Sequence, residues 1–501
     1  MQEFEDLKKR LGEVSALASA AGILEWDHQT HMPAGGAANR AVQLEVLSKI
    51  THEMSVSSET ERLLKAAEKS VESLDPDSDE AAFVRIARRD FDHSAKLPTV
   101  LVSEIARVSA LAHESWAEAR AESNYSKFAP WLEKIVDLER QVADHLGHTG
   151  ERYDALLDQY EPGMKAADVR AMFDAIKPTS VALVKAIVER GPNAVDDSVI
   201  KRDFDEAKQL AFGEAVIKEI GFDFERGRQD RAVHPFCSSF TSGDVRITTR
   251  FDRNFLSMAL FGTIHETGHA LYEQGIAPRY DGNTLGGGTS LGVHESQSRL
   301  WENLVGRSRA FWTHFYPSLQ STFPESLGDV APERFYRAVN KVEPSLIRVE
   351  ADEVTYNLHI MLRFEMENDL LEGRLEVKDA PAAWNAKMRE YFGLTPPDDA
   401  QGILQDVHWS MASFGYFPTY SLGNIISAQL FAQANTDLGG VSAQIERGEF
   451  APLLGWLREN IHQWGRKYTA GELLQRITGK SLDTDPYLTY LKTKYGDIYG
   501  L

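Results

Sequence analysis

Cysteine is almost absent from the sequence, since Cys237 is the only one among 501 residues. A single cysteine cannot form a disulfide bond within the chain, and this scarcity suits a reducing compartment. Long apolar runs are also missing, because the most apolar stretch, 256–264, is interrupted by Ser, Gly and Thr and is too short to cross a bilayer. The N-terminal residues MQEFEDLKKRLGEV are amphipathic and lack the apolar core of a secretory signal. We therefore expect a cytoplasmic protein with no membrane span.

Positive charge is in deficit. The chain has 54 Lys and Arg residues against 75 Asp and Glu, which gives a formal net charge of −21 and a pI near 5.2. Binding to nucleic-acid phosphates or to anionic lipid requires a basic surface, so we expect neither nucleic acid nor membrane as a partner. With 43% hydrophobic and 26% charged residues, the composition is that of a globular protein able to bury a large core.

Helical periodicity dominates the sequence. Apolar residues recur at helical spacing through 1–160 and from about 166 to 219. The pattern breaks at four short segments rich in Pro, Gly or Asp: 31–36, 74–80, 96–98 and 161–163. Side chains alternate over 244–251 instead, which predicts a half-buried strand with a charged outer face. One face of that strand carries Val245, Ile247, Thr249 and Phe251. Helical patterns return from 254, so the sequence predicts a mainly α-helical fold with a small sheet.

The segment His265-Glu266-Thr267-Gly268-His269 lies in a helical pattern that ends at Gly275, which we interpret as a C-terminal cap. Histidines at positions i and i+4 share one helix face, so both imidazoles can bind one Zn²⁺, with the glutamate positioned as general base. We therefore predict that His265 and His269 bind one zinc ion per chain. Co²⁺ is a possible substitute because it accepts similar ligands.

A catalytic zinc ion needs a third protein ligand. Glu273 lies on the same stripe, but a helix rises about 12 Å between His265 and Glu273, too far for ligands that bind at about 2 Å. A later helical segment, which follows a glycine-rich reversal, supplies Glu295 instead. Its neighbour His294 points about 100° away on the helix, so only one of the two can face the metal. We predict Glu295 as the ligand and leave His294 a supporting position beside it.

These features resemble the gluzincin zinc peptidases, and further segments are similar to the carboxypeptidase Taq family of metallocarboxypeptidases. The similar segments are Trp26-Asp27-x-x-Thr30-x-Met32-Pro33, His234-Pro235-Phe236, Asp244-x-Arg246-x-Thr248, His294-Glu295-Ser296-Gln297, Ile347-Arg348-x-x-Ala351-Asp352 and Gly402-x-x-Gln405-Asp406-x-His408-Trp409. The resemblance extends over essentially the whole chain. It implies a large, mainly α, saddle-shaped single-domain peptidase with a small antiparallel β-sheet beside a long active-site groove.

The resemblance also implies an activity and a domain arrangement. It indicates a homodimer that removes C-terminal residues one at a time, with broad specificity, from peptides with a free C-terminus. We expect one metallocarboxypeptidase domain over 1–501. Within it, 1–230 would form a mainly helical subregion and 231–501 a catalytic subregion that carries the HExxH helix and the groove.

Three residues are candidates for catalysis. Glu266 would take a proton from the attacking water and deliver it to the departing amine. The tetrahedral oxyanion needs a further donor, for which the resemblance points to the loop 415–420. We choose Tyr420, although Tyr416 is a near neighbour and such aromatic side chains are often simply packed. His234 could orient substrate or donate to the oxyanion, or could simply be satisfied within the His-Pro turn.

Two arginines are candidates for substrate binding. Arg348 could hold the terminal carboxylate of the substrate through a bidentate contact, and its alternative is an ordinary i, i+4 ion pair with Asp352 on an exposed helix face. Arg246 could help to close the groove while its strand pairs with the substrate backbone. Alternatively, Arg246 could simply be part of the polar face of an edge strand. Asp406 and His408 could orient a zinc ligand.

Alternative functions remain at this point. An oligopeptidase of the same zinc architecture would cleave internal bonds, and would accept C-terminally amidated peptides. A zinc aminopeptidase is disfavoured because no Gly-x-Met-Glu-Asn-like segment precedes HExxH. A non-catalytic helical scaffold with a structural zinc is disfavoured because the glutamate of the motif is present.

Overall fold

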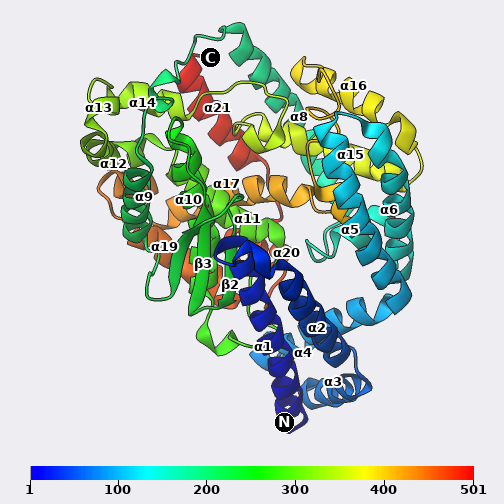
Figure 1. Ribbon diagram of the computed structural model, residues 1–501. Helices are drawn as coiled ribbons and strands as arrows, with labels where there is room; N and C mark the ends of the chain where they lie inside the picture. The colour runs from blue at the N-terminus through cyan, green and yellow to red at the C-terminus, as the bar shows by residue number, and fades with distance from the viewer. Residues whose placement is uncertain (1) are drawn as a thin grey trace. The chain divides into compact units, whose positions relative to one another are not determined.

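The computed structural model describes residues 2–501, and most of them are helical (Figure 1). The contacts divide the chain into two compact units, one made of 2–95, 197–339 and 430–482, the other of 96–196, 340–429 and 483–501. Each unit therefore combines segments that are far apart in the sequence. The prediction of one catalytic domain over 1–501, with subregions 1–230 and 231–501, stays a prediction.

The first unit holds most of the shorter helices and the only strands among residues 2–501. Its helices are α1 (Gln2–Thr30), α2 (Ala37–Ser55), α3 (Ser58–Val71), α4 (Asp79–Lys96), α9 (Glu206–Ile220), α10 (Leu256–Gly275), α11 (Leu291–Arg299), α12 (Arg309–Thr322), α13 (Pro324–Leu327), α14 (Pro332–Val339), α18 (Val441–Glu446), α19 (Ala451–Asn460) and α20 (Ala470–Thr478). A π-helical segment, η4 (Leu300–Val305), continues directly from α11.

The second unit is helical throughout its regular structure. Its helices are α5 (Thr99–Ala121), α6 (Tyr125–Leu146), α7 (Arg152–Leu157), α8 (Ala166–Glu189), α15 (Tyr356–Leu371), α16 (Ala380–Phe392), α17 (Pro418–Asp437), which begins there, and α21 (Asp485–Tyr499). Among residues 2–501 no helix combines the length and the apolar character needed to span a bilayer.

The amphipathic pattern of the N-terminal region produces the packing that it predicts. Helices α1, α3 and α4 bury their apolar stripes in a common core. That core includes Phe4, Leu7, Leu64, Ala67, Phe83 and Ala87. The helices also end where proline, glycine and aspartate interrupt the pattern, since α1 stops at Thr30 and α4 begins at Asp79. The prediction of a mainly α-helical fold is confirmed.

The small sheet is confirmed, but the expectation that it is antiparallel is wrong. Its strands, β1 (Gly227–Arg231), β2 (Cys237–Thr241) and β3 (Asp244–Thr249), lie in the order β1-β3-β2. Strand β3 pairs antiparallel with β2 and parallel with β1. The chain reverses once between β1 and β2 and once more before β3, so the first and last strands run the same way. Alternation along one strand shows which side chains are buried, and does not show the direction of its neighbours.

Strand β3 buries the face that its alternation predicts. Val245, Ile247 and Thr249 have no exposed surface. Phe251 lies beyond the end of the strand, and Thr248 is also fully buried, where its hydroxyl accepts a hydrogen bond from the Phe236 amide. Helix α10 packs against this strand, so the sheet forms a support for the helix that carries HExxH.

Helices α10 and α11 approach each other closely at Gly268. A Cβ atom at this position would lie 2.5 Å from the Cα of Ser298 and 2.6 Å from the carbonyl oxygen of Gln297. The predicted helix end at Gly275 is confirmed, but Gly275 is no left-handed cap, because Ile276 continues in extended conformation. Glycine is needed there because a Cβ would lie 2.6 Å from the His462 ring.

We predict that Gly268→Ala lowers the stability of the metal-free protein by about 1–3 kcal/mol, because an added methyl group would push the two helix backbones apart. It should also weaken metal binding, since α11 carries Glu295. The measurements are Tm by calorimetry and metal affinity by chelator competition.

Gly262→Ala is the matched control. It lies on the same helix, and its Cβ would make only ordinary contacts at 3.7 Å and beyond. Removing a helical glycine should leave stability unchanged or raise it by up to about 1 kcal/mol. A Gly268→Ala protein with the wild-type Tm and metal affinity would show that the close approach is unimportant.

Candidate metal centre and substrate-binding cluster

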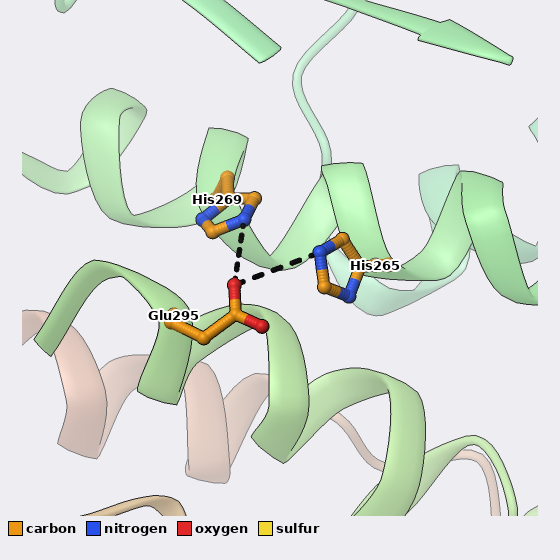
Figure 2. A group of neighbouring side chains, drawn as sticks. All are labelled: His265, His269 and Glu295. Atoms are coloured by element: carbon orange, nitrogen blue, oxygen red, sulfur yellow. Dashed lines mark ion pairs between the residues drawn. The ribbon is translucent and has the colours of Figure 1, made fainter. Parts of the chain in front are cut away.

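Three side chains of the first unit converge as the sequence predicts (Figure 2). The Oε2 atom of Glu295 lies 3.7 Å from Nε2 of His265 and 3.4 Å from Nε2 of His269. Ligand atoms at 2.0–2.1 Å from a tetrahedral zinc ion are about 3.3–3.4 Å apart. These residues therefore fit a metal ion, and they form the only such group of His, Cys, Asp or Glu found within residues 2–501.

The local structure explains this convergence. One helical turn of α10 separates the two histidines, and α11 begins at a cap where the Ser290 hydroxyl accepts a hydrogen bond from the Val293 amide. The contact at Gly268 then holds α11 close enough for Glu295 to reach both imidazoles.

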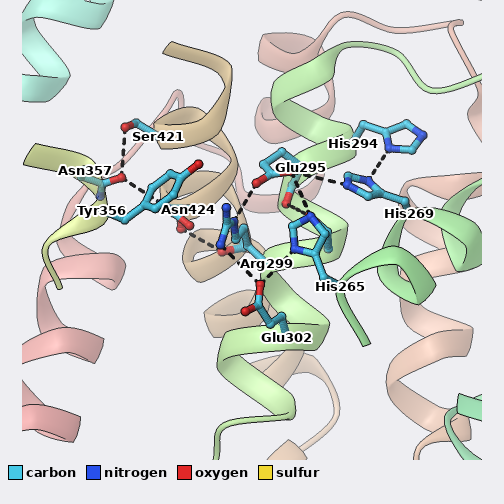
Figure 3. Close-up of polar contacts among 12 residues, drawn as sticks. His265, His269, His294, Glu295, Arg299, Glu302, Tyr356, Asn357, Ser421 and Asn424 are labelled. Carbon is cyan, nitrogen blue, oxygen red and sulfur yellow. Dashed lines mark hydrogen bonds and ion pairs between the residues drawn. The ribbon is translucent and has the colours of Figure 1, made fainter. Parts of the chain in front are cut away.

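The Nδ1 atoms of His265 and His269, which point away from Glu295, contact different partners (Figure 3). Nδ1 of His265 lies 2.9 Å from Oε2 of Glu302. Nδ1 of His269 lies 2.6 Å from Nδ1 of His294, whose Nε2 lies 2.8 Å from Oε1 of Glu273. If both ligand histidines carry their proton on Nδ1, their Nε2 lone pairs face Glu295 and are available to a metal. Glu273 therefore belongs to the support of the site.

Sequence reasoning missed Glu302 and assigned the orienting role to Asp406 and His408 instead. A signal was present, because Glu295, Arg299 and Glu302 recur at i, i+4 and i+7, which is one helical stripe. Glu302 itself lies in the π-helical segment η4, and such segments are frequent at functional sites.

Burial and charge set the protonation of this group. Burial alone would raise the pKa of Glu295, but Arg299 and the two imidazoles hold it well below its ordinary value. Burial lowers the pKa of His269 to about 4, so this imidazole is neutral at pH 7, as a metal ligand must be.

Glu266 differs from its neighbours. It is only 7% exposed, and burial, together with the charges of Glu295 and Glu302, raises its pKa to about 7 against the opposing effect of His265. A carboxyl group with a pKa near neutrality can both accept and return a proton.

In the second unit, Arg348 lies in a buried polar cluster and is 5% exposed. Its Nε and Nη2 donate to Oδ1 of Asp406 at 3.0 and 2.7 Å, and its Nη1 donates to the Tyr356 hydroxyl at 2.8 Å. Arg363 donates from Nε to the other Asp406 oxygen at 2.7 Å. The alternative of an exposed ion pair with Asp352 is wrong, because Asp352 instead accepts hydrogen bonds from backbone amides.

Tyr420 lies beside this cluster. The guanidinium carbon of Arg348 is 5.0 Å from the Tyr420 ring centroid, and the Tyr420 hydroxyl is 3.3 Å from Nε2 of His408. Burial and the two cluster arginines lower the pKa of His408 to about 4, so its ring is neutral at pH 7. Tyr416 instead packs edge-on against Tyr160 and Tyr420.

The first turns of α17, which carry Tyr420, are anchored to α15. The Asn357 side-chain oxygen of α15 accepts hydrogen bonds from the Ser421 hydroxyl at 3.0 Å and from the Asn424 amide at 2.8 Å (Figure 3). These buried contacts fix the start of α17 and therefore the backbone position of Tyr420.

Arg246 and His234 belong neither to the contacts around the candidate metal ligands nor to the polar cluster of Arg348. Arg246 forms a fork with Asp244, with both donor–acceptor distances 2.8 Å, and stacks 4.3 Å from the Trp26 ring centroid. Its strand β3 lies between β1 and β2, so the expectation that this strand pairs with substrate backbone is wrong, and so is the alternative of an edge strand. His234 is exposed in the bend between β1 and β2.

The chain resembles a known family over nearly its whole length. Residues 6–495 match the sequence model of the carboxypeptidase Taq (M32) metallopeptidases. The chain belongs to this family. It is accordingly a metallocarboxypeptidase, a metal-dependent peptide hydrolase.

Individual relatives agree in length and fold. Thermostable carboxypeptidase 1 of Thermus thermophilus is 42% identical, with 99% of both chains aligned, and carboxypeptidase 1 of Bacillus subtilis is 38% identical over 100% of this chain and 99% of its own. The crystal structure of the M32 carboxypeptidase from Deinococcus radiodurans superposes with a TM-score of 0.97 at 42% identity, with both chains fully covered.

We predict that Glu302→Gln weakens metal binding by about 10–100-fold, because a neutral amide no longer fixes the His265 tautomer as firmly as a carboxylate. Chelator competition measures the dissociation constant. Glu325→Gln, an exposed change in the same unit, should leave it unchanged. Equal affinities for the wild type and Glu302→Gln would remove Glu302 from the metal site.

Proposed function

We propose that this metallocarboxypeptidase depends on zinc and releases single amino acids from the C-terminus of peptides with broad specificity. The observation that supports the proposal is the group of His265, His269 and Glu295 with Glu266 beside it on the same helix. Three protein ligands leave one position of a tetrahedral ion open, which distinguishes a catalytic zinc site from a structural one. Co²⁺ is a possible substitute.

Zn²⁺ held by these three residues would polarise the scissile carbonyl and make a water molecule acidic enough to lose its proton near pH 7. Glu266 accepts that proton, since its pKa is raised to about 7 and it does not occupy a ligand position. The same carboxyl group then returns the proton to the amine of the departing residue, because an amide anion is too basic to leave.

We predict that Glu266→Gln retains one metal ion per chain and lowers kcat by about 10²–10⁴-fold, since the amide cannot accept the proton of water. Metal analysis and peptide hydrolysis on the same sample separate the two effects. Near-normal turnover in a fully metal-loaded Glu266→Gln protein would exclude this role.

We propose Arg348 as the residue that binds the terminal carboxylate of the substrate. A guanidinium group has five N–H donors, and the contacts with Asp406 and Tyr356 use three of them. One N–H on each terminal nitrogen is left to donate to a carboxylate. Asp406 holds the guanidinium in place while Tyr356 fixes its orientation.

We predict that wild type strongly prefers a peptide with a free C-terminus to its amide. Arg348→Ala and Arg348→Lys should lower this preference by about 10–100-fold, because a charged hydrogen-bonded pair is worth about 1.5–3 kcal/mol. The measurement is the ratio of kcat/KM for the acid and the amide within each variant, so a general folding defect largely cancels.

Arg374→Ala is the control for this experiment, because Arg374 is a surface residue of the same unit, paired with Asp369. Its acid-to-amide ratio should equal that of wild type. An unchanged ratio in Arg348→Ala would place the anchor elsewhere, with Arg246 as the next residue to test. Equal hydrolysis of acid and amide by wild type would favour the oligopeptidase alternative.

The roles of the two remaining catalytic candidates are proposals. Tyr420 is proposed as the donor to the oxyanion, with support from its anchored position beside Arg348, and His234 as a further donor or substrate contact. The homodimer and the cytoplasmic location stay predictions.

A further inference from the structure

We propose that Arg299 is a positioning residue that makes Glu295 bind its metal ion through one oxygen only. This inference rests on the proposed function, in which Glu295 is the third ligand. Nε of Arg299 donates to Oε1 of Glu295 at 2.7 Å, whereas Oε2 is the oxygen that lies 3.4 and 3.7 Å from the two imidazoles. Oε1 of Glu295 is thus hydrogen-bonded to Arg299, and Oε2 faces His265 and His269 (Figure 3).

The number of carboxylate oxygens that bind matters for catalysis. A carboxylate can bind a metal through one oxygen or through both. If both Glu295 oxygens bound, the second would take the position that water or the substrate carbonyl needs. Binding through both oxygens would require Oε1 to turn from Arg299 towards the metal. The charge-assisted hydrogen bond from Arg299 opposes this movement, because the bond would have to break in a buried site.

Arg299 is itself held firmly. Its Nη1 lies 3.3 Å from Oε2 of Glu302, the carboxylate oxygen that also contacts His265. The other oxygen of Glu302 accepts from Nη2 of Arg307 at 3.1 Å, and the Arg307 guanidinium lies 3.7 Å from the Phe261 ring centroid and donates to the Val339 carbonyl. Arg299 therefore links the proposed ligand Glu295 to Glu302, the carboxylate that supports the ligand His265. A movement of its guanidinium group would disturb both contacts.

A second contact competes for Oε2 of Glu295. The Ser298 hydroxyl lies 3.1 Å from this oxygen, but only 2.8 Å from the Glu295 carbonyl oxygen. Its single proton can therefore point to the backbone, which leaves Oε2 available. Arg299 has no such choice, because a guanidinium only donates.

The test uses Co²⁺ in place of zinc in the full chain, because the visible bands of Co²⁺ are intense for four ligands and weaken when a fifth is added. Wild type should show the four-ligand spectrum, from three residues and one water. Arg299→Gln and Arg299→Lys should lose the intense bands at saturating Co²⁺, since neither side chain can bind Oε1 and Glu302 as a planar fork does. Arg309→Gln, a surface change at the start of α12, should keep the wild-type spectrum.

The possible outcomes are distinguishable. A wild-type spectrum already typical of five ligands overturns the inference, and this measurement does not depend on whether any variant folds. Four-ligand spectra in both Arg299 variants overturn it as well, because Glu295 would then keep one oxygen free without help. Failure of wild type to bind one Co²⁺ per chain would instead contradict the proposed metal ligands. The inference is supported if the Arg299 variants lose the intense bands while wild type and Arg309→Gln keep them.

Discussion

The contact between the backbones of α10 and α11 at Gly268 is the constraint on which the candidate metal centre depends. Two histidines on one helix can offer only two ligands, and the third must come from another helix at a fixed distance. Without a side chain at position 268, the backbone of α11 lies against α10, and the Glu295 carboxylate reaches both imidazoles. Helix α10 also packs against strands β2 and β3, so the sheet supports this helix pair.

Buried charge is the second determinant of the site. Two carboxylates, Glu295 and Glu302, are kept ionised against burial by Arg299, Arg307 and the imidazoles. For Glu266 the opposing effect of His265 is too small, and burial together with the charges of Glu295 and Glu302 raises its pKa to about 7. One cluster therefore contains two carboxylates whose lowered pKa values suit them to hold a cation, and one carboxyl group with a pKa near neutrality, which suits it to move protons.

Much of this could be predicted from the sequence, because the decisive residues follow local rules. Helical spacing placed His265 and His269 on one face, and the length of a helix excluded Glu273 as a ligand. Glu302 was missed although it continues the helical stripe of Glu295 and Arg299, because its contact with His265 depends on how α10 packs against the π-helical segment. The partner of Arg348 could not be found either, because Asp406 is 58 positions away in the chain and local spacing offered Asp352. Strand direction was wrong for a similar reason, because it depends on a neighbour and not on the strand itself.

The π-helical segment also limits how this part of the chain can change. Hydrogen bonds from i to i+5, as between the Gly306 amide and the Trp301 carbonyl, accommodate one residue more in the turn than an α-helix does. A substitution within 300–305 changes one side chain and keeps this wide turn. Deletion of one residue would convert it to an ordinary turn and rotate the side chains that follow within this segment by about 100° relative to α11. The helix that carries the supporting carboxylate therefore tolerates exchange of residues far better than loss of one.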